Sequence, residues 1–207
     1  MSAIDVLNSV LNEIGITKSA PELSTTSDLD VIEIRNFMNL AGQEIARRAD
    51  FAELYVDVGT GGNISSYDLP QSFSRLPSMG GTVKLNKQGV FTPVIPVVED
   101  ASWQLVAARA SSHLYHYHLL NKKILFSPVL DSDGALVRYI SKYWVNDPAS
   151  GADVIGDNGD ILLVPENLVQ KGTVWRWRRR KGMSFEDHLA EFEADIETEL
   201  ASNRGGL

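Results

Sequence analysis

Three of the four histidines lie close together in the chain, at His113, His116 and His118. In an extended strand the side chains of His116 and His118 point to the same face, a spacing that two ligands of one metal ion can use. His113 would face the other way if the strand began that early, and no Asp or Glu lies nearby in the sequence. Histidines that alternate with tyrosines are also typical of a half-exposed strand, so we predict no metal site and no cofactor.

Loops rich in glycine and aspartate are the next candidates for chemistry. The sequence GTGG at 59–62 lacks the Lys-Ser/Thr pair of a phosphate-binding loop. DSDG at 131–134 and GDNGD at 156–160 resemble calcium loops but lack the carboxylate at the twelfth position. No serine lies in a Gly-x-Ser-x-Gly elbow, although a Ser-His-Asp triad assembled in space is left open. The chain has no cysteine, which excludes disulfides and thiolate chemistry, and we expect a protein that is not an enzyme.

The strongest feature of the sequence is the segregation of charge near the C-terminus. Six bases and no acid lie between 171 and 181, namely Lys171, Arg176, Arg178, Arg179, Arg180 and Lys181. Seven acids and no Lys or Arg lie between 183 and 200, namely Glu186, Asp187, Glu191, Glu193, Asp195, Glu197 and Glu199.

Two functions could explain this pattern. With Trp175 and Trp177 interleaved, the arginines could contact nucleic-acid phosphates while the tryptophans stack on bases. Alternatively, the basic arm of a helical hairpin pairs with its own acidic arm or with that of a neighbouring subunit. The chain carries 19 basic and 27 acidic residues, and the net charge of −8 opposes non-specific attraction to DNA. We therefore favour ion pairing.

Length and composition predict a folded protein. The 207 residues are 43% hydrophobic and 22% charged, which suits one domain with embellishments or two very small ones. No apolar stretch approaches the roughly 20 residues that span a bilayer, so we expect no membrane association. The first 15 residues include acidic side chains and no basic cluster, which is unlike a signal peptide. We expect a soluble protein of a reducing or neutral compartment.

The elements that position these residues follow from periodicity. Apolar spacing predicts one helix over 3–14. It predicts a second helix that begins at Ser27, in a capping box with Asp30, and ends at about Asp50. Strand-like runs follow from 53 to about 145, with one helical piece at 100–110 and a hairpin turn at DSDG. A helix then has Pro165 at its first position and ends at Gly182, and Ser184 caps the last helix.

This order predicts an α+β fold, in which N-terminal and C-terminal helices flank a central antiparallel β region. We place the N-terminal helices in 1–52, the β-rich region in 53–160 and the C-terminal helical hairpin in 161–207. The helices are expected to pack together as one body.

Several segments together resemble a known family. Tyr67-Asp68-Leu69-Pro70 leads into Ser72-Phe73-Ser74-Arg75-Leu76, and Pro165-Glu166-Asn167-Leu168-Val169 is followed by Gly172, Trp175-Arg176-Trp177, the basic run and Gly182. This pattern resembles the head-to-tail adaptor (connector) proteins of tailed bacteriophages over most of the chain. Two positions depart from the family pattern, because Val164 replaces a common leucine and serines flank Phe73 where aspartate-phenylalanine is usual.

The resemblance implies a structural, non-enzymatic protein of the virion neck, present in the host cytoplasm during assembly. Such proteins form a ring, usually twelve-fold, beneath the portal protein, where they extend the DNA channel and dock the next stopper or tail component. Double-stranded DNA passes through without specific binding. The alternatives are a stopper or tail-completion protein of the same neck, and a nucleic-acid-binding protein that uses 175–181.

In that family the C-terminal helices commonly engage the portal. The residues expected at the portal or subunit interface are therefore Trp175, Arg176, Trp177, Arg178, Arg179, Arg180, Lys181, Phe185 and Phe192. We also expect that reversing the charge of Arg178 and Arg179 weakens ring assembly and leaves the monomer folded.

Overall fold

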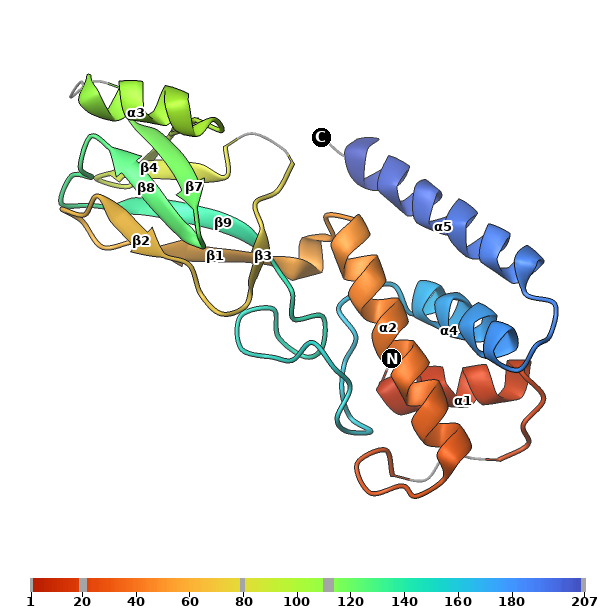
Figure 1. The fold of residues 1–207 in the computed structure, drawn as a ribbon. Coiled ribbons are helices and arrows are strands. Elements are labelled where there is room, and N and C mark those ends of the chain that lie inside the picture. The colour runs from red at the N-terminus through yellow and green to blue at the C-terminus, as the bar shows by residue number, and fades with distance from the viewer. Residues whose placement is uncertain (1, 19–21, 79–80, 110–113, 206–207) are drawn as a thin grey trace. The chain divides into compact units, whose positions relative to one another are not determined.

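The computed structural model describes residues 2–18, 22–78, 81–109 and 114–205, which form two compact units. One unit comprises Met1–Tyr55 and Ser141–Leu207, and the other comprises Val56–Ile140. Helices lie at both ends of the chain and strands lie between them, which confirms the predicted α+β fold (Figure 1). Among the described residues no helix is both long enough and apolar enough to span a membrane.

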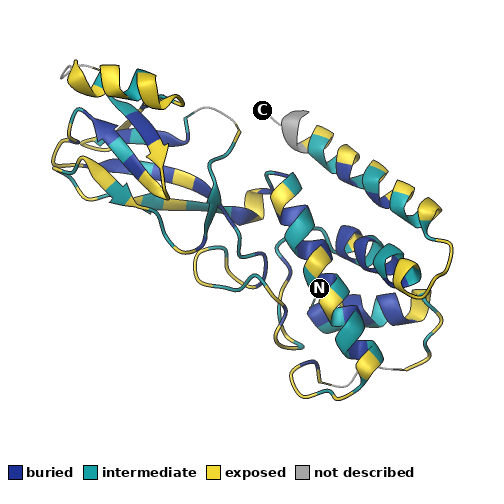
Figure 2. Ribbon diagram, viewed as in Figure 1, coloured by how far each residue is buried: buried dark blue, intermediate teal, exposed yellow. Residues whose placement is uncertain are grey.

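The first unit is helical. It contains α1 (Ala3–Glu13), α2 (Leu29–Arg48), the short 3-10 helix η1 (Ala52–Leu54), α4 (Glu166–Arg180) and α5 (Glu186–Gly205). Helix α4 is central, because α1, α2 and α5 all pack against it. The apolar stripe predicted on α2 is buried, at Val31, Ile34, Met38, Ala41 and Ile45. Figure 2 shows buried residues concentrated on α1, α2 and α4.

The helix ends differ slightly from the prediction. Helix α2 begins at Leu29, and its N-cap is Asp28, whose carboxylate accepts the Asp30 backbone N–H at 3.0 Å. The predicted cap at Ser27 is therefore wrong by one residue, since Asp caps a helix as well as Ser does. Pro165 is the N-cap of α4 with ψ 123°, so it precedes the helix and does not occupy its first position.

At the turn between α4 and α5, one prediction holds and one fails. Gly182 adopts φ +69°, the left-handed conformation that ends α4 as predicted. Ser184 does not cap α5, which begins at Glu186. Its hydroxyl donates to the Glu186 carboxylate instead, at 3.3 Å.

The segment that follows the strands belongs to the helical unit. Sequence reasoning assigned 141–160 to the β-rich region, but the β-rich unit ends at Ile140. The anchor of this segment is Trp144, which is fully buried and donates from Nε1 to the Asp153 carbonyl at 2.8 Å. Its ring lies against Gly42 of α2, where a Cβ atom would be only 2.4 Å from the ring. Position 42 therefore has to be glycine for this ring to pack.

The second unit consists of two small sheets. One has the order β1 (Tyr55–Gly59), β9 (Ala135–Ser141), β4 (Val83–Lys87) and β5 (Val90–Pro93), with β3 (Phe73–Arg75) also pairing with β9. The other has the order β2 (Ser66–Asp68), β8 (Lys123–Ser127), β7 (His116–Leu120) and β6 (Ile95–Pro96). Strand β4 is antiparallel to β5 and β9, and β8 is antiparallel to β2 and β7.

The two sheets share one hydrophobic core. Val83, Leu85 and Val137 from the first sheet cluster with Tyr117, Ile124 and Phe126 from the second. The predicted antiparallel region is confirmed for the pairs of β4 and β8, whereas β6 and β7 pair in parallel. The helix α3 (Asp100–Ala108) lies between these two strands in the sequence, as predicted.

The turn at DSDG is not the hairpin that we predicted. Gly134 N–H donates to the Asp131 carbonyl at 3.1 Å, so a turn does form. However, the strands on either side belong to different sheets, because β8 pairs with β7 whereas β9 pairs with β4. The local turn signal was sound, but strand partners depend on which apolar faces meet in the core.

Candidate functional site

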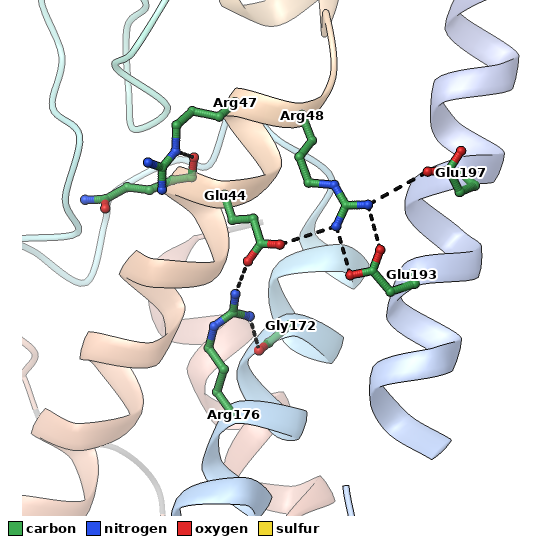
Figure 3. A network of polar contacts seen from close by, with 8 residues as sticks. Glu44, Arg47, Arg48, Gly172, Arg176, Glu193 and Glu197 are labelled. Carbon is green, nitrogen blue, oxygen red and sulfur yellow. Dashed lines mark hydrogen bonds and ion pairs between the residues drawn. The ribbon is translucent and has the colours of Figure 1, made fainter. Parts of the chain in front are cut away.

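The basic stretch of α4 forms a charge network with two other helices. Arg176 is only 11% exposed, pairs with Glu44 of α2 and donates to the Gly172 carbonyl at 2.6 Å (Figure 3). Burial lowers the pKa of Arg176, and the Glu44 carboxylate opposes that shift. The guanidinium thus holds α4 against α2.

Arg48 of α2 extends this network to α5. Its two terminal nitrogens contact the Glu193 carboxylate at 2.9 and 2.6 Å, and one of them also lies 3.3 Å from Glu44 (Figure 3). Glu197 lies 3.8 Å from the same guanidinium. The hydrogen bond from Arg48 lowers the pKa of Glu193, and the carboxylate in turn raises the pKa of Arg48. Glu44 therefore lies between two arginines, and Glu44 and Arg48 together link α2 to α4 and α5.

The remaining paired bases lie in the N-terminal half of α4 and at its C-terminal end. Lys171 contacts Asp195 at 2.7 Å and Glu191 at 2.5 Å, and both carboxylates raise its pKa. At the other end, Lys181 contacts Glu33 of α2 at 2.7 Å and lowers the pKa of that carboxyl. Arg180 lies 3.5 Å from the same carboxylate.

Pairing of the basic arm with the acidic arm of the same hairpin is therefore only part of the structure. It occurs through Lys171, whereas Arg176, Arg180 and Lys181 pair with α2. Sequence reasoning missed the α2 partners Glu33, Glu44 and Arg48. The sequence did contain a signal for Glu33 and Glu44. They are 11 residues apart, which is about three helical turns, so both carboxylates lie on one face of the helix.

Arg178 and Arg179 differ from the other four bases. Arg178 donates from Nε to the Ser184 carbonyl at 2.7 Å, and the Arg179 guanidinium lies 5.7 Å from the centre of the Phe185 ring. In the described part of the chain, neither guanidinium contacts a carboxylate. The last turn of α4 therefore carries two positive charges that no carboxylate of the described residues neutralises.

The aromatic residues of the predicted interface lie mostly inside the helical unit. Phe192 is fully buried and Trp177 is 8% exposed, so both contribute to the core. Trp175 is half-buried, and its ring lies 4.2 Å from the Arg176 guanidinium carbon and 6.4 Å from the Phe192 ring. The Nε1 atoms of Trp175 and Trp177 are buried and have no hydrogen-bond partner among the described residues.

These positions sort the predicted interface residues into two groups. Arg179, Arg180 and Lys181 are exposed, and Arg178 and Phe185 are half-buried, so a partner could reach them. Phe192 and Trp177 are buried in the core of the helical unit, where a partner cannot contact them directly. The interface role of the whole set stays a prediction.

His118 of β7 makes contacts within the β-rich unit. His118 is 3% exposed, with Nδ1 2.7 Å from the Val97 carbonyl oxygen and Nε2 3.0 Å from the Asp100 carboxylate. Its ring also stacks on Trp103 of α3 at 5.5 Å. His113 lies outside the described residues, and within them no group of three or more His, Cys, Asp or Glu could hold a metal ion. His118 therefore holds α3 against the sheet.

Comparison with known proteins agrees with the sequence resemblance. A family model described as SU10 adaptor protein matches residues 1–206 of the 207-residue chain. No curated protein matches the chain. The match covers both units, and it confirms the predicted resemblance to phage adaptors.

Proposed function

Since the chain belongs to the SU10 adaptor protein family and is thus a phage adaptor and a structural protein of the virion, we propose that it forms a ring under the portal. Twelve copies would extend the DNA channel in the neck and dock the next stopper or tail component. The family match over 1–206 is the observation that carries this proposal. The role is non-enzymatic and needs no cofactor, and the chain would meet its partners in the host cytoplasm during assembly.

The distribution of charge supports a conduit for DNA. The chain has a net charge of −8, and four of the six bases near α4 contact carboxylates of the same chain. Binding to duplex DNA depends on free cations that replace the counterions of the phosphates. Pairing of these four bases leaves fewer cations near α4 that could hold a moving duplex.

Electron microscopy of the protein mixed with the portal ring encoded beside it tests the proposal. We expect a new layer of density on the narrow end of the portal. A portal that stays bare, under conditions in which both proteins are folded, would overturn the adaptor role. A stopper or tail-completion role in the same neck would then be favoured.

A nucleic-acid-binding role is the second candidate, because Arg178 and Arg179 have no carboxylate partner among the described residues. Two phosphate contacts would give a slope of about −1.8 in a plot of log K against log salt concentration, at about −0.9 per contact. Titration of the isolated chain with duplex DNA at several salt concentrations measures this slope. As an adaptor, the chain should show no such binding.

A further inference from the structure

The two ends of α4 carry opposite features. Arg178 and Arg179, which contact no carboxylate among the described residues, lie in its last turn, and its first turn borders a pocket. The helix has 15 residues, and at 1.5 Å per residue its ends are about 22 Å apart. A single copy therefore cannot bring its own arginines to its own pocket.

The pocket combines an apolar floor with an acidic rim. It has a volume of about 310 Å³, and its floor includes Phe51, Leu162 and Val164, which are 4%, 7% and 3% exposed. Glu53 of η1 and Glu199 of α5 lie at its rim. Within the described ranges neither of these carboxylates forms an ion pair. The pocket thus places the Glu53 and Glu199 carboxylates beside an apolar floor.

An arginine side chain fits this combination. Its aliphatic stem can lie on apolar surface while the guanidinium pairs with carboxylates. We infer that the Arg178–Arg179 end of one copy docks into the Glu53–Glu199 pocket of the next copy. This inference rests on the proposed ring and names the contact that would build it.

The placement of the two patches suits a ring. A contact between different patches on successive copies is heterologous, and it leaves one free patch of each kind at every step until the ring closes. The arginines and the pocket satisfy this condition, since they lie at opposite ends of the same helix in the same unit. A two-fold dimer would instead occupy both patches of each copy at once and leave none free to extend the assembly.

Cross-linking between single cysteines tests the contact directly, because the chain has no cysteine of its own. Met183, 44% exposed, follows the arginines, and the exposed Ala52 precedes Glu53, so Met183→Cys and Ala52→Cys leave all four charges in place. A short bismaleimide added to a mixture of the two variants should give a cross-linked dimer. A chain with both cysteines should give a ladder of multimers, and each single variant alone should give at least about tenfold less dimer.

Charge reversal then identifies the groups that hold the contact. Arg178→Glu with Arg179→Glu in the Met183→Cys chain should reduce the cross-linked dimer at least about tenfold. Adding Glu53→Lys with Glu199→Lys in the Ala52→Cys chain should restore it. The matched control is Arg109→Glu with Lys122→Glu, which changes the net charge equally at exposed residues of the other unit and should have no effect.

Each outcome decides the inference separately from the adaptor proposal. Absence of the dimer, both in free solution and with the portal present, overturns the inference, as does a dimer that persists after charge reversal. Cross-linking of Met183→Cys to the portal alone also overturns it, because the portal would then be the occupant. A layer on the portal without the dimer leaves the adaptor role intact, whereas the dimer with a bare portal supports the contact and overturns the adaptor role.

Discussion

Phe192 should hold α5 to the rest of the helical unit. It is one of only two residues of α5 that are buried in the described part of the chain, and the other is Ile196. A Cβ atom built on Gly172 would lie 3.0 Å from the Phe192 ring, so α4 presents bare backbone at this point. With no side chain at 172 to move in, the neighbours cannot fill the space that the ring would leave.

The expected effect of Phe192→Ala follows from this packing. Replacing a buried phenylalanine by alanine costs about 3–5 kcal/mol, and poor refilling of the cavity favours the upper part of that range. The ion pairs of α5 cannot compensate, because partly exposed pairs contribute at most about 1 kcal/mol each. We therefore expect the free energy of unfolding of the helical unit to fall by about 4 kcal/mol.

Urea denaturation followed by tryptophan fluorescence measures this loss. Three of the four tryptophans, Trp144, Trp175 and Trp177, lie in the helical unit, so the emission reports mainly on it. Phe192→Leu keeps most of the apolar volume and should cost less than about 1.5 kcal/mol. Thr198→Ala, at an exposed position of α5, should stay within about 0.5 kcal/mol of the wild type. A loss below about 1 kcal/mol for Phe192→Ala would refute this account of how α5 packs.

Three further predictions concern other contacts. Gly42→Ala should lower the melting temperature. Overpacking against the fully buried Trp144 costs about 1–3 kcal/mol, which outweighs the roughly 1 kcal/mol gained in helix propensity. A higher melting temperature would contradict this packing. Arg48 holds the pKa of Glu193 below its ordinary 4.5, so the pair stabilises the fold above pH 4.5 and this contribution is lost as the pH falls through the lowered pKa. The urea midpoint should therefore drop on acidification, and less steeply in Arg48→Met; parallel curves would argue against the pair. His118→Ala removes two contacts worth about 1 kcal/mol each. Helix α3 has no buried residue (Figure 2), so its amide hydrogens should exchange about tenfold faster or more in this variant. Unchanged exchange would contradict the role of His118 in holding α3.

The sequence was sufficient for elements whose signal is local. The apolar period of 31–45 located α2, because a side chain at every third or fourth position must face the core. Gly182 located the end of α4, because glycine adopts the left-handed conformation that ends a helix. Boundaries shifted by a residue where two neighbouring side chains could both serve as a cap, as at Ser27 and Asp28. These errors are small because the caps compete within one turn.

The charge network could not be predicted in the same way. Arg176 and Glu44 are 132 residues apart in the sequence, and Arg48 and Glu193 are 145 apart. Such pairs form only after the helices pack, and the pattern of charges along α4 and α5 suggested the simpler pairing between neighbours in the chain. The hairpin prediction at DSDG was wrong for a related reason. A turn fixes the local path of the backbone but does not determine which strand the following strand pairs with.

The connections of the β-rich unit have a consequence for how this protein can change. Strands β1 and β9 are neighbours in one sheet, with Asp57 beside Arg138 at 2.6 Å. The Thr60 backbone N–H, just after β1, donates to the Ala135 carbonyl at the start of β9 at 2.8 Å, so the start of β1 lies beside the end of β9. The chain therefore enters and leaves this unit on adjacent strands, about 5 Å apart. In its connectivity the whole of Val56–Ile140 is an insertion into the helical unit, which the chain leaves after Tyr55 and re-enters at Ser141. The pairing of β1 with β9 keeps these two points close together. Loops between these strands can therefore be lengthened, shortened or exchanged without a change in the chain's entry and exit points, so the two units can evolve separately.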